Sequence, residues 1–265
     1  MKNIIKGFII GIGKIIPGLS GAILAILMGV YDKSIYYINN YKNNKKESIK
    51  YLFPIGTGIF LAIFFFSRLI NTLLNKYYLL TMMFFGGLII GTIPSIYKEI
   101  KKSDFYLCFI SLIIFSFLSI VSIRNTYTIQ NNFIDYFMFF LSGLIEALGT
   151  IVPGVSSTSL LMLIGTYKII ISSIGSLSNI KVLIPFMLGI IFGVFFIIRI
   201  IGKLLEEKKS SIYAFVLGML LSTTESMIIR PIIKKNNSVY EVLLGIILII
   251  IGIFITNIFE NKKTQ

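Results

Sequence analysis

The chain has 265 residues, 56% of them hydrophobic, with a formal net charge of +14 and a mean hydropathy of +0.90. This composition predicts one polytopic membrane domain and counts against a soluble fold. The basic residues lie in short clusters between apolar runs, a pattern that favours positive-inside topology and anionic lipid head groups. We therefore expect the membrane, and no nucleic acid, as a partner.

The residue types present also narrow the chemistry. The sequence has no histidine, and its one cysteine, Cys108, lies in an apolar run. Disulfide frameworks, Cys/His zinc sites and Ser-His-Asp hydrolysis are excluded, and so are lipid phosphatases that need a histidine. We expect no metal, no cofactor and no catalytic residue.

The first apolar run is interrupted by Pro17-Gly18-Leu19-Ser20-Gly21. About 13 apolar residues precede Pro17, too few to cross a hydrocarbon core that needs about 20. Proline and glycine break a helix and leave unpaired amides, which lipid tolerates only beside protein or a water-filled cavity. Amides at the start of the next half-helix suit an anion. We predict a re-entrant hairpin: an arm along residues 4–16, a break at 17–21 and a return arm along 22–38.

The rest of the chain follows the same plan twice. After a basic linker at 42–50, spans are predicted at about 52–75, 78–97 and 104–123, and residues 124–132 form a polar junction. The second half has a broken stretch at 133–174, which contains Pro153-Gly154-Val155-Ser156-Ser157, and spans at about 182–202, 211–229 and 239–259.

Equivalent residues recur at fixed spacing. At a shift of 136, Gly13, Pro17, Gly18, Ser20, Gly29 and Tyr31 fall on Gly149, Pro153, Gly154, Ser156, Gly165 and Tyr167. At a shift of 131, Pro54, Gly58, Arg68, Gly87 and Thr92 fall on Pro185, Gly189, Arg199, Gly218 and Thr223. This register indicates an internal duplication, with residues 1–132 and 133–265 as two repeats of one membrane domain.

The predicted fold is an all-α polytopic membrane protein with two inverted repeats, each a re-entrant broken-helix hairpin plus three transmembrane helices. Three spans per half is an odd number, so the second half enters the membrane inverted. With the amino terminus inside, fourteen basic residues lie in inner stretches and six in outer stretches. This bias predicts that both termini are cytoplasmic. Eight spans in parallel repeats is the competing topology, because the first arm of the second hairpin is long enough to cross.

Paired interruptions in two halves of a hydrophobic chain indicate a transporter's binding site. Arg68 and Arg199 lie in apolar spans at matching positions, and the planar arginine fork fits phosphate. The alternative is that both side chains reach the membrane interface. We predict that the substrate contacts the two breaks and both arginines: Pro17, Gly18, Ser20, Gly21, Arg68, Pro153, Gly154, Ser156, Ser157 and Arg199.

Other residues have structural and functional interpretations of similar weight. Ser20 and Ser156, with Ser157 to Ser159, could cap helices or contact the ligand. Glu146 and Glu225 lie in apolar stretches, where each could carry a proton, supply a counter-charge, or form an ion pair with Arg68 or Arg199. Close packing between helices is the favoured role of four glycines: Gly13, Gly29, Gly149 and Gly165.

The doubled motifs, Pro17-Gly18-Leu19-Ser20-Gly21 running to Gly29-Val30-Tyr31 and Pro153-Gly154-Val155-Ser156-Ser157 running to Gly165-Thr166-Tyr167, resemble those of the PopT family of bacterial polyprenyl-phosphate translocases. Ala22 and Ile23, and Ser157 in the second motif, depart from the family pattern. The resemblance implies movement of undecaprenyl phosphate, the lipid carrier of cell-wall precursors, from the outer to the inner leaflet of the cytoplasmic membrane for reuse. A coupling ion is a further candidate partner.

Two other functions remain open on the sequence. A secondary transporter for a small soluble anion would use the same chemistry at the two breaks. A membrane enzyme that cleaves a lipid pyrophosphate belongs to a different class, and the lack of histidine counts against it.

Overall fold

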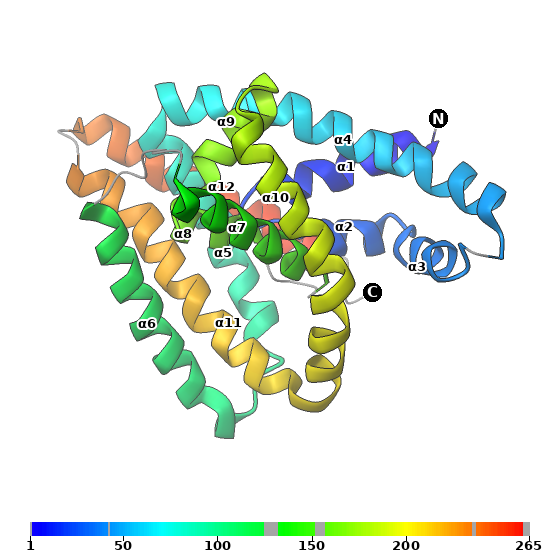
Figure 1. Ribbon diagram of the computed structural model, residues 1–265. Coiled ribbons are helices and arrows are strands. Elements are labelled where there is room, and N and C mark those ends of the chain that lie inside the picture. Colours follow the sequence, from blue (N-terminus) through cyan, green and yellow to red (C-terminus); the bar gives the residue numbers. More distant parts are fainter. Residues whose placement is uncertain (1, 42, 125–131, 152–156, 235–236, 262–265) are drawn as a thin grey trace.

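The computed structural model describes residues 2–41, 43–124, 132–151, 157–234 and 237–261. Every regular element in these ranges is a helix (Figure 1). The α-helices are α1 Lys2–Ile15, α2 Gly21–Leu27, α3 Tyr31–Asn39, α4 Lys45–Lys76, α5 Tyr78–Tyr97, α6 Phe105–Arg124, α7 Phe133–Ile151, α8 Ser157–Leu163, α9 Tyr167–Ser176, α10 Ile180–Phe192, α11 Ile198–Lys234 and α12 Val239–Asn261. A 3-10 turn, Lys102–Asp104, precedes α6, and a π-helix, Gly193–Ile197, joins α10 to α11.

The prediction of a polytopic membrane protein is confirmed. Among the described residues, four helical segments are long and apolar enough to cross a bilayer: α4, α5, residues 207–233 of α11, and residues 239–260 of α12. The number rises to six if each of two bent helix pairs counts as one span. The spans predicted at 52–75, 78–97 and 239–259 lie within α4, α5 and α12.

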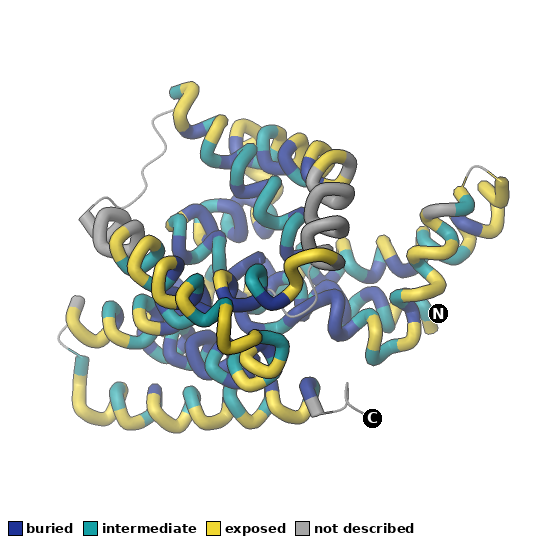
Figure 2. The backbone as a smooth tube through the Cα atoms, turned by 90° about the horizontal axis from the view of Figure 1, so that it is seen from below, coloured by how far each residue is buried: buried dark blue, intermediate teal, exposed yellow. Residues whose placement is uncertain are grey.

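The outer helices expose apolar side chains as lipid contact requires. Along α12, Ile246, Ile250 and Phe254 are 46%, 61% and 65% exposed, and recur at the helical period. In Figure 2 exposed residues of all types follow the outer helices, whereas buried residues gather at the centre of the molecule. A contiguous apolar surface of this kind is rare on a soluble protein and ordinary in a bilayer.

The first hairpin contains two interruptions where the sequence predicted one, and the described part of the second hairpin repeats the later of them. After the first break, α2 and α3 meet at an angle of 103°, and the corresponding α8 and α9 meet at 114°. The bends fall at Gly29 and Gly165, whose φ angles of +63° and +82° favour glycine. A methyl group on either would meet nothing within 4 Å, so the prediction that these two glycines pack helices together is wrong. The return arm predicted along 22–38 is therefore two short helices.

The helices before residue 132 and those after it form two parts, and each part packs its last helix on the other part. Within each part the first helix lies along the fourth, α1 against α4 and α7 against α10. The last helix of each part instead packs on the other part: α12 lies against α5, and α6 lies against α11. The helices α5 and α11 contact each other between them, and α6 and α11 run side by side in Figure 1.

Glycines make the close contacts between these helices, and they do so at matching positions. A methyl group at Gly58 would overlap the Ile4 carbonyl oxygen, so α1 and α4 touch backbone to backbone. The same contact recurs between α7 and α10, where the α1 positions are shifted by 136 residues and the α4 positions by 131. The matching pairs are Gly7 with Ile55 and Gly143 with Phe186, and Gly58 with Ile4 and Gly189 with Phe140.

The turn between α5 and α6 is fastened to a kink in α11. The kink is at Lys208, where φ is −132° and ψ is 38°. Next to it, Ser210 accepts a hydrogen bond from the Lys101 amide at 2.8 Å, and Lys209 pairs with Glu99 at 2.6 Å. Hydrogen bonding from Ser210 also lowers the pKa of Asp104. The kink lies between the spans predicted at 182–202 and 211–229.

Candidate functional site

The first break lies in the protein interior, against α5. Pro17 and Gly18 are buried, and Gly18 has a φ of +83°. A methyl group on Gly18 would lie 2.6 Å from the Ile89 nitrogen, so only glycine fits between the chain and α5. The Ser20 hydroxyl accepts a hydrogen bond from the Ile23 amide at 3.4 Å and caps α2. This cap is the structural role anticipated for Ser20.

The second break is described only where α8 begins. Pro153, Gly154 and Ser156 lie outside the described residues. Ser157 packs against Gly149, where a methyl group would lie 2.6 Å from the Ser157 nitrogen. A methyl group on Gly13 would overlap the Leu24 side chain of α2, so next to each break a glycine lets two helices approach, as predicted.

Side chains that flank the two breaks converge on one carboxylate. Glu146 on α7 accepts a hydrogen bond from the Lys14 ammonium at 3.0 Å through Oε1. Its Oε2 accepts one from the Ser157 hydroxyl at 2.7 Å. Lys14 lies in the last turn of α1, three residues before Pro17. A single carboxylate thus links α1, α7 and α8, and among the side chains that the structure describes its ion-pair partner is Lys14.

This ion pair is poorly solvated. The side chains of Lys14 and Glu146 are 20% and 13% exposed. Removing two charges from water costs several kcal/mol per ion, which their attraction only partly offsets. A partly buried pair is therefore a weak source of stability, and an ionisable residue among membrane helices is a candidate for function.

One buried polar contact joins the second hairpin to the first, and another lies within the second hairpin. The Tyr167 hydroxyl donates to the Ile15 carbonyl at 2.7 Å, at the end of α1. Thr166 and Ser142 share a hydrogen bond of 2.9 Å between their hydroxyls. Ser159 in α8 is fully buried, and its hydroxyl has no hydrogen-bond partner among the described residues.

Arg68 lies at the interface of α4 and α9, away from the breaks in its described contacts. Its Nε donates to the Gly175 carbonyl at 2.5 Å, and its guanidinium carbon lies 4.3 Å from the centre of the Phe64 ring. A cation at the carboxyl end of a helix such as α9 is favourable. The side chain is exposed and lines an open hollow of about 380 Å³, whose other lining residues are Asn71, Thr72, Ser172, Gly175 and Ser176.

Of the remaining predicted residues, only Glu225 has a described side chain, and its described contact is with a different helix. The side chain of Arg199 lies outside the described residues. Glu225 on α11 is exposed and accepts a hydrogen bond from Ser116 of α6 at 3.4 Å. The structure therefore brings Glu146 and Ser157 together and leaves Arg68 and Glu225 in different places.

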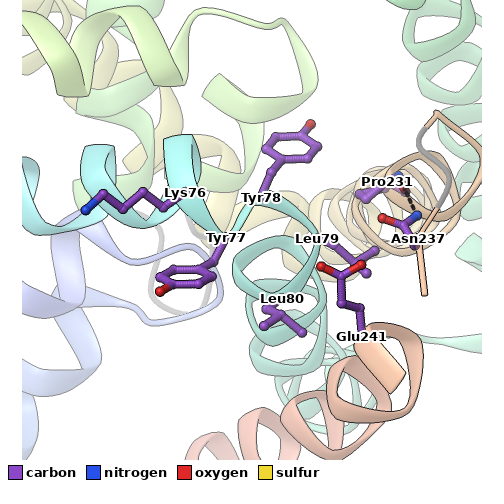
Figure 3. A pocket seen from close by; sticks show the side chains of 8 residues that line it. All are labelled: Lys76, Tyr77, Tyr78, Leu79, Leu80, Pro231, Asn237 and Glu241. Atoms are coloured by element: carbon purple, nitrogen blue, oxygen red, sulfur yellow. Dashed lines mark hydrogen bonds between the residues drawn. The ribbon is translucent and has the colours of Figure 1, made fainter. Parts of the chain in front are cut away.

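A second hollow, of about 330 Å³, lies between the α4–α5 turn and the beginning of α12 (Figure 3). Its lining residues are Lys76, Tyr77, Tyr78, Leu79, Leu80, Pro231, Asn237 and Glu241. Asn237 closes one side by donating to the Pro231 carbonyl at 3.0 Å. No described residue of either break lines this hollow, so it is not the candidate site.

Lys14 is the site residue that the sequence pattern did not identify. The paired motifs consist of residues present in both repeats, whereas Thr150 stands at the position that matches Lys14. One signal could have identified it. Lys14 is the one charged residue between Lys6 and Asp32, a stretch of apolar and small residues that includes the first break.

Comparisons with known proteins found two named relatives and one matching family model. A polyprenyl-phosphate transporter of Staphylococcus aureus is 29% identical over 240 residues, which are 83% of this chain and 83% of that protein. A polyprenyl-phosphate transporter of Vibrio cholerae is 26% identical over 239 residues, which are 84% of this chain and 76% of that protein. No solved structure matches the chain significantly. The model of the undecaprenyl phosphate translocase-like family matches residues 10–241, and the chain belongs to that family.

Proposed function

We propose that the protein transports polyprenyl phosphate, specifically undecaprenyl phosphate, from the outer to the inner leaflet of a bacterial cytoplasmic membrane. The returned carrier would be reused for envelope precursors. The observation that carries the proposal is the family match over residues 10–241, joined by two relatives that are named polyprenyl-phosphate transporters.

The head group would bind between the breaks while the tail remains in lipid. The first contact surface comprises Pro17, Gly18, Ser20 and Gly21, and the second comprises Pro153, Gly154, Ser156 and Ser157. The convergence of Lys14, Glu146 and Ser157 supports this location, because it brings the edges of both breaks to one polar group.

Arg68 would receive the head group before it reaches the breaks. Thr72, Ser172 and Ser176 also line its open hollow. Thr72 and Ser176 donate to the Arg68 and Ser172 carbonyls, and their hydroxyls would turn from these carbonyls to donate to phosphate oxygens. The guanidinium adds paired donors of fixed geometry. Arg199, at the matching repeat position, would serve the head group in the other leaflet.

The two halves would act as inverted repeats with both termini cytoplasmic. The repeated glycine contacts support duplication, and the excess of lysine in the inner stretches supports this orientation. Alternating access between the halves would then expose the head group to each leaflet in turn. The protein would act as a transporter rather than an enzyme.

Reconstitution tests the proposal. Purified protein in liposomes that contain a fluorescent polyprenyl phosphate should move label between leaflets, measured with an impermeant quencher. Arg68→Ala should slow movement at least tenfold, Arg68→Lys should slow it less because the charge remains, and Lys76→Ala on the same helix should leave it unchanged. Uptake of soluble phosphate without lipid movement would instead select the small-anion transporter. Release of inorganic phosphate from lipid pyrophosphate would select the enzyme.

A further inference from the structure

We propose that the Lys14 ammonium binds the anionic head group, and that the Glu146 carboxylate takes the place of the head group on Lys14 when no substrate is present. The inference rests on the proposed function and adds a binding residue that the paired motifs do not contain. Substrate would thus replace a carboxylate that belongs to the protein.

The geometry positions Lys14 for this role. The stem of Lys14 passes over the first break, because a methyl group on Gly21 would lie 2.5 Å from the Lys14 Cγ. Its ammonium ends at Glu146, 3.0 Å away, beside the start of α8. The charge therefore lies between the first break and the start of α8, next to the proposed place of the head group.

The exchange follows from charge. Lys14 and Glu146 together are neutral, whereas a phosphate monoester carries one to two negative charges near neutral pH. A phosphate on Lys14 would repel an ionised Glu146 at close range and weaken the hold of Glu146 on the ammonium. Binding at Lys14 and release of Glu146 are therefore the same event.

Release of Glu146 would also loosen the contact between the hairpins. The same carboxylate holds the Ser157 hydroxyl at 2.7 Å and joins α7 to α1. Neither charge is duplicated, since Thr150 and Ile10 stand at the positions that match Lys14 and Glu146. Substrate binding would thus remove an interaction between the two halves and permit a change of access.

Binding to the purified full-length protein tests the exchange, with farnesyl phosphate as a soluble probe and farnesol as the uncharged control. Lys14→Gln should weaken farnesyl phosphate binding at least tenfold, and Lys14→Arg should retain most of it. Glu146→Gln should bind at least as tightly as the parent, because the competing carboxylate is removed. Lys6→Gln is the matched control: it removes the same charge from α1, where Lys6 donates to the Met28 carbonyl, and should change nothing.

An ion pair with a purely structural role gives a different result. Both single variants would then weaken binding and lower the melting temperature, and Lys14→Gln with Glu146→Gln would restore both; that result overturns the inference. If Lys14→Gln does not fold, the Glu146→Gln variant tests the inference by itself, and weaker farnesyl phosphate binding by that variant overturns the inference. A parent protein that binds and moves the lipid while Lys14→Gln binds equally well would overturn the role of Lys14 alone. A parent that neither binds the probe nor moves lipid would overturn the proposed function.

Discussion

Single side chains secure the breaks at the points where the backbone cannot pair with itself. A helix that ends in an apolar environment leaves carbonyls without partners, and each such group is costly. Tyr167 supplies a donor to the Ile15 carbonyl from a hydroxyl that is 152 residues away in the sequence. Ser20 supplies an acceptor to the Ile23 amide from within the same turn. The first break is thus satisfied partly from the other hairpin.

Removing the Tyr167 hydroxyl should destabilise the protein. Tyr167→Phe leaves the buried Ile15 carbonyl without this donor, at a cost of about 1–3 kcal/mol in the free energy of unfolding. Denaturation of the purified protein in detergent measures the loss. Tyr31→Phe, at the matching repeat position, is the control, because no described hydrogen bond involves the Tyr31 hydroxyl. Equal losses in the two variants would contradict the assigned bond.

Local patterns predicted the residues at the breaks, but they did not predict which residues contact each other. Pro17 and Gly18 disrupt a helix in any context, so the interruption can be read from the sequence. The contact of Glu146 with Lys14 cannot be read from the sequence, because Lys14 lies 132 positions away and only the packing of α1 on the second hairpin brings the two together. Gly29 was misassigned because a glycine needed for a positive φ and a glycine needed for close packing look the same in sequence.

At the scale of helices, the positions of glycines fix the path of each hairpin. Gly18 and Gly29 both have a positive φ, but only Gly18 lies against another backbone. Gly18→Ala should cost more than the strain of about 1–2 kcal/mol, because the added methyl also displaces α5. Gly29→Ala should lower the free energy of unfolding by the backbone strain alone. Thermal unfolding of the two variants gives the comparison, and a larger loss for Gly29→Ala would contradict this account.

The contact of α1 with α4 should be as sensitive as that of α7 with α10. Gly58→Leu and Gly189→Leu each place a side chain on a neighbouring carbonyl, and we expect each to lower the free energy of unfolding by about 1–3 kcal/mol or more. Gly56→Leu has the same change on the same helix, with nothing within 4 Å, and should cost less than about 0.5 kcal/mol. A loss in only one of the paired variants would show that the two contacts are not equivalent.

At the scale of the molecule, the relative orientation of the two halves can be tested directly. Glu47 and Ser178 are exposed and occupy matching positions, 131 residues apart. In a Cys108→Ala background, an impermeant maleimide added to intact cells should label Ser178→Cys, whereas Glu47→Cys should react only after permeabilisation. Labelling of both from the same side would favour parallel repeats.

The sequence predicted the course of the chain through the membrane better than the arrangement of its helices. Hydrophobic length located α4, α5 and α12, because a span needs about 20 apolar residues whatever surrounds it. The crosswise packing of α6 on α11 and of α12 on α5 was not predicted, because α5, α6 and α12 are apolar almost all round and the apolar pattern does not select their partners.

This crosswise packing has a consequence during biosynthesis. The surface of α5 that α12 covers leaves the ribosome long before α12 is made. Until then, lipid or an insertion chaperone must shield that surface, and the nascent chain cannot complete its first half on its own. Assembly therefore waits for the last helix, and a ribosome that stalls before α12 would release a chain with both halves unfinished.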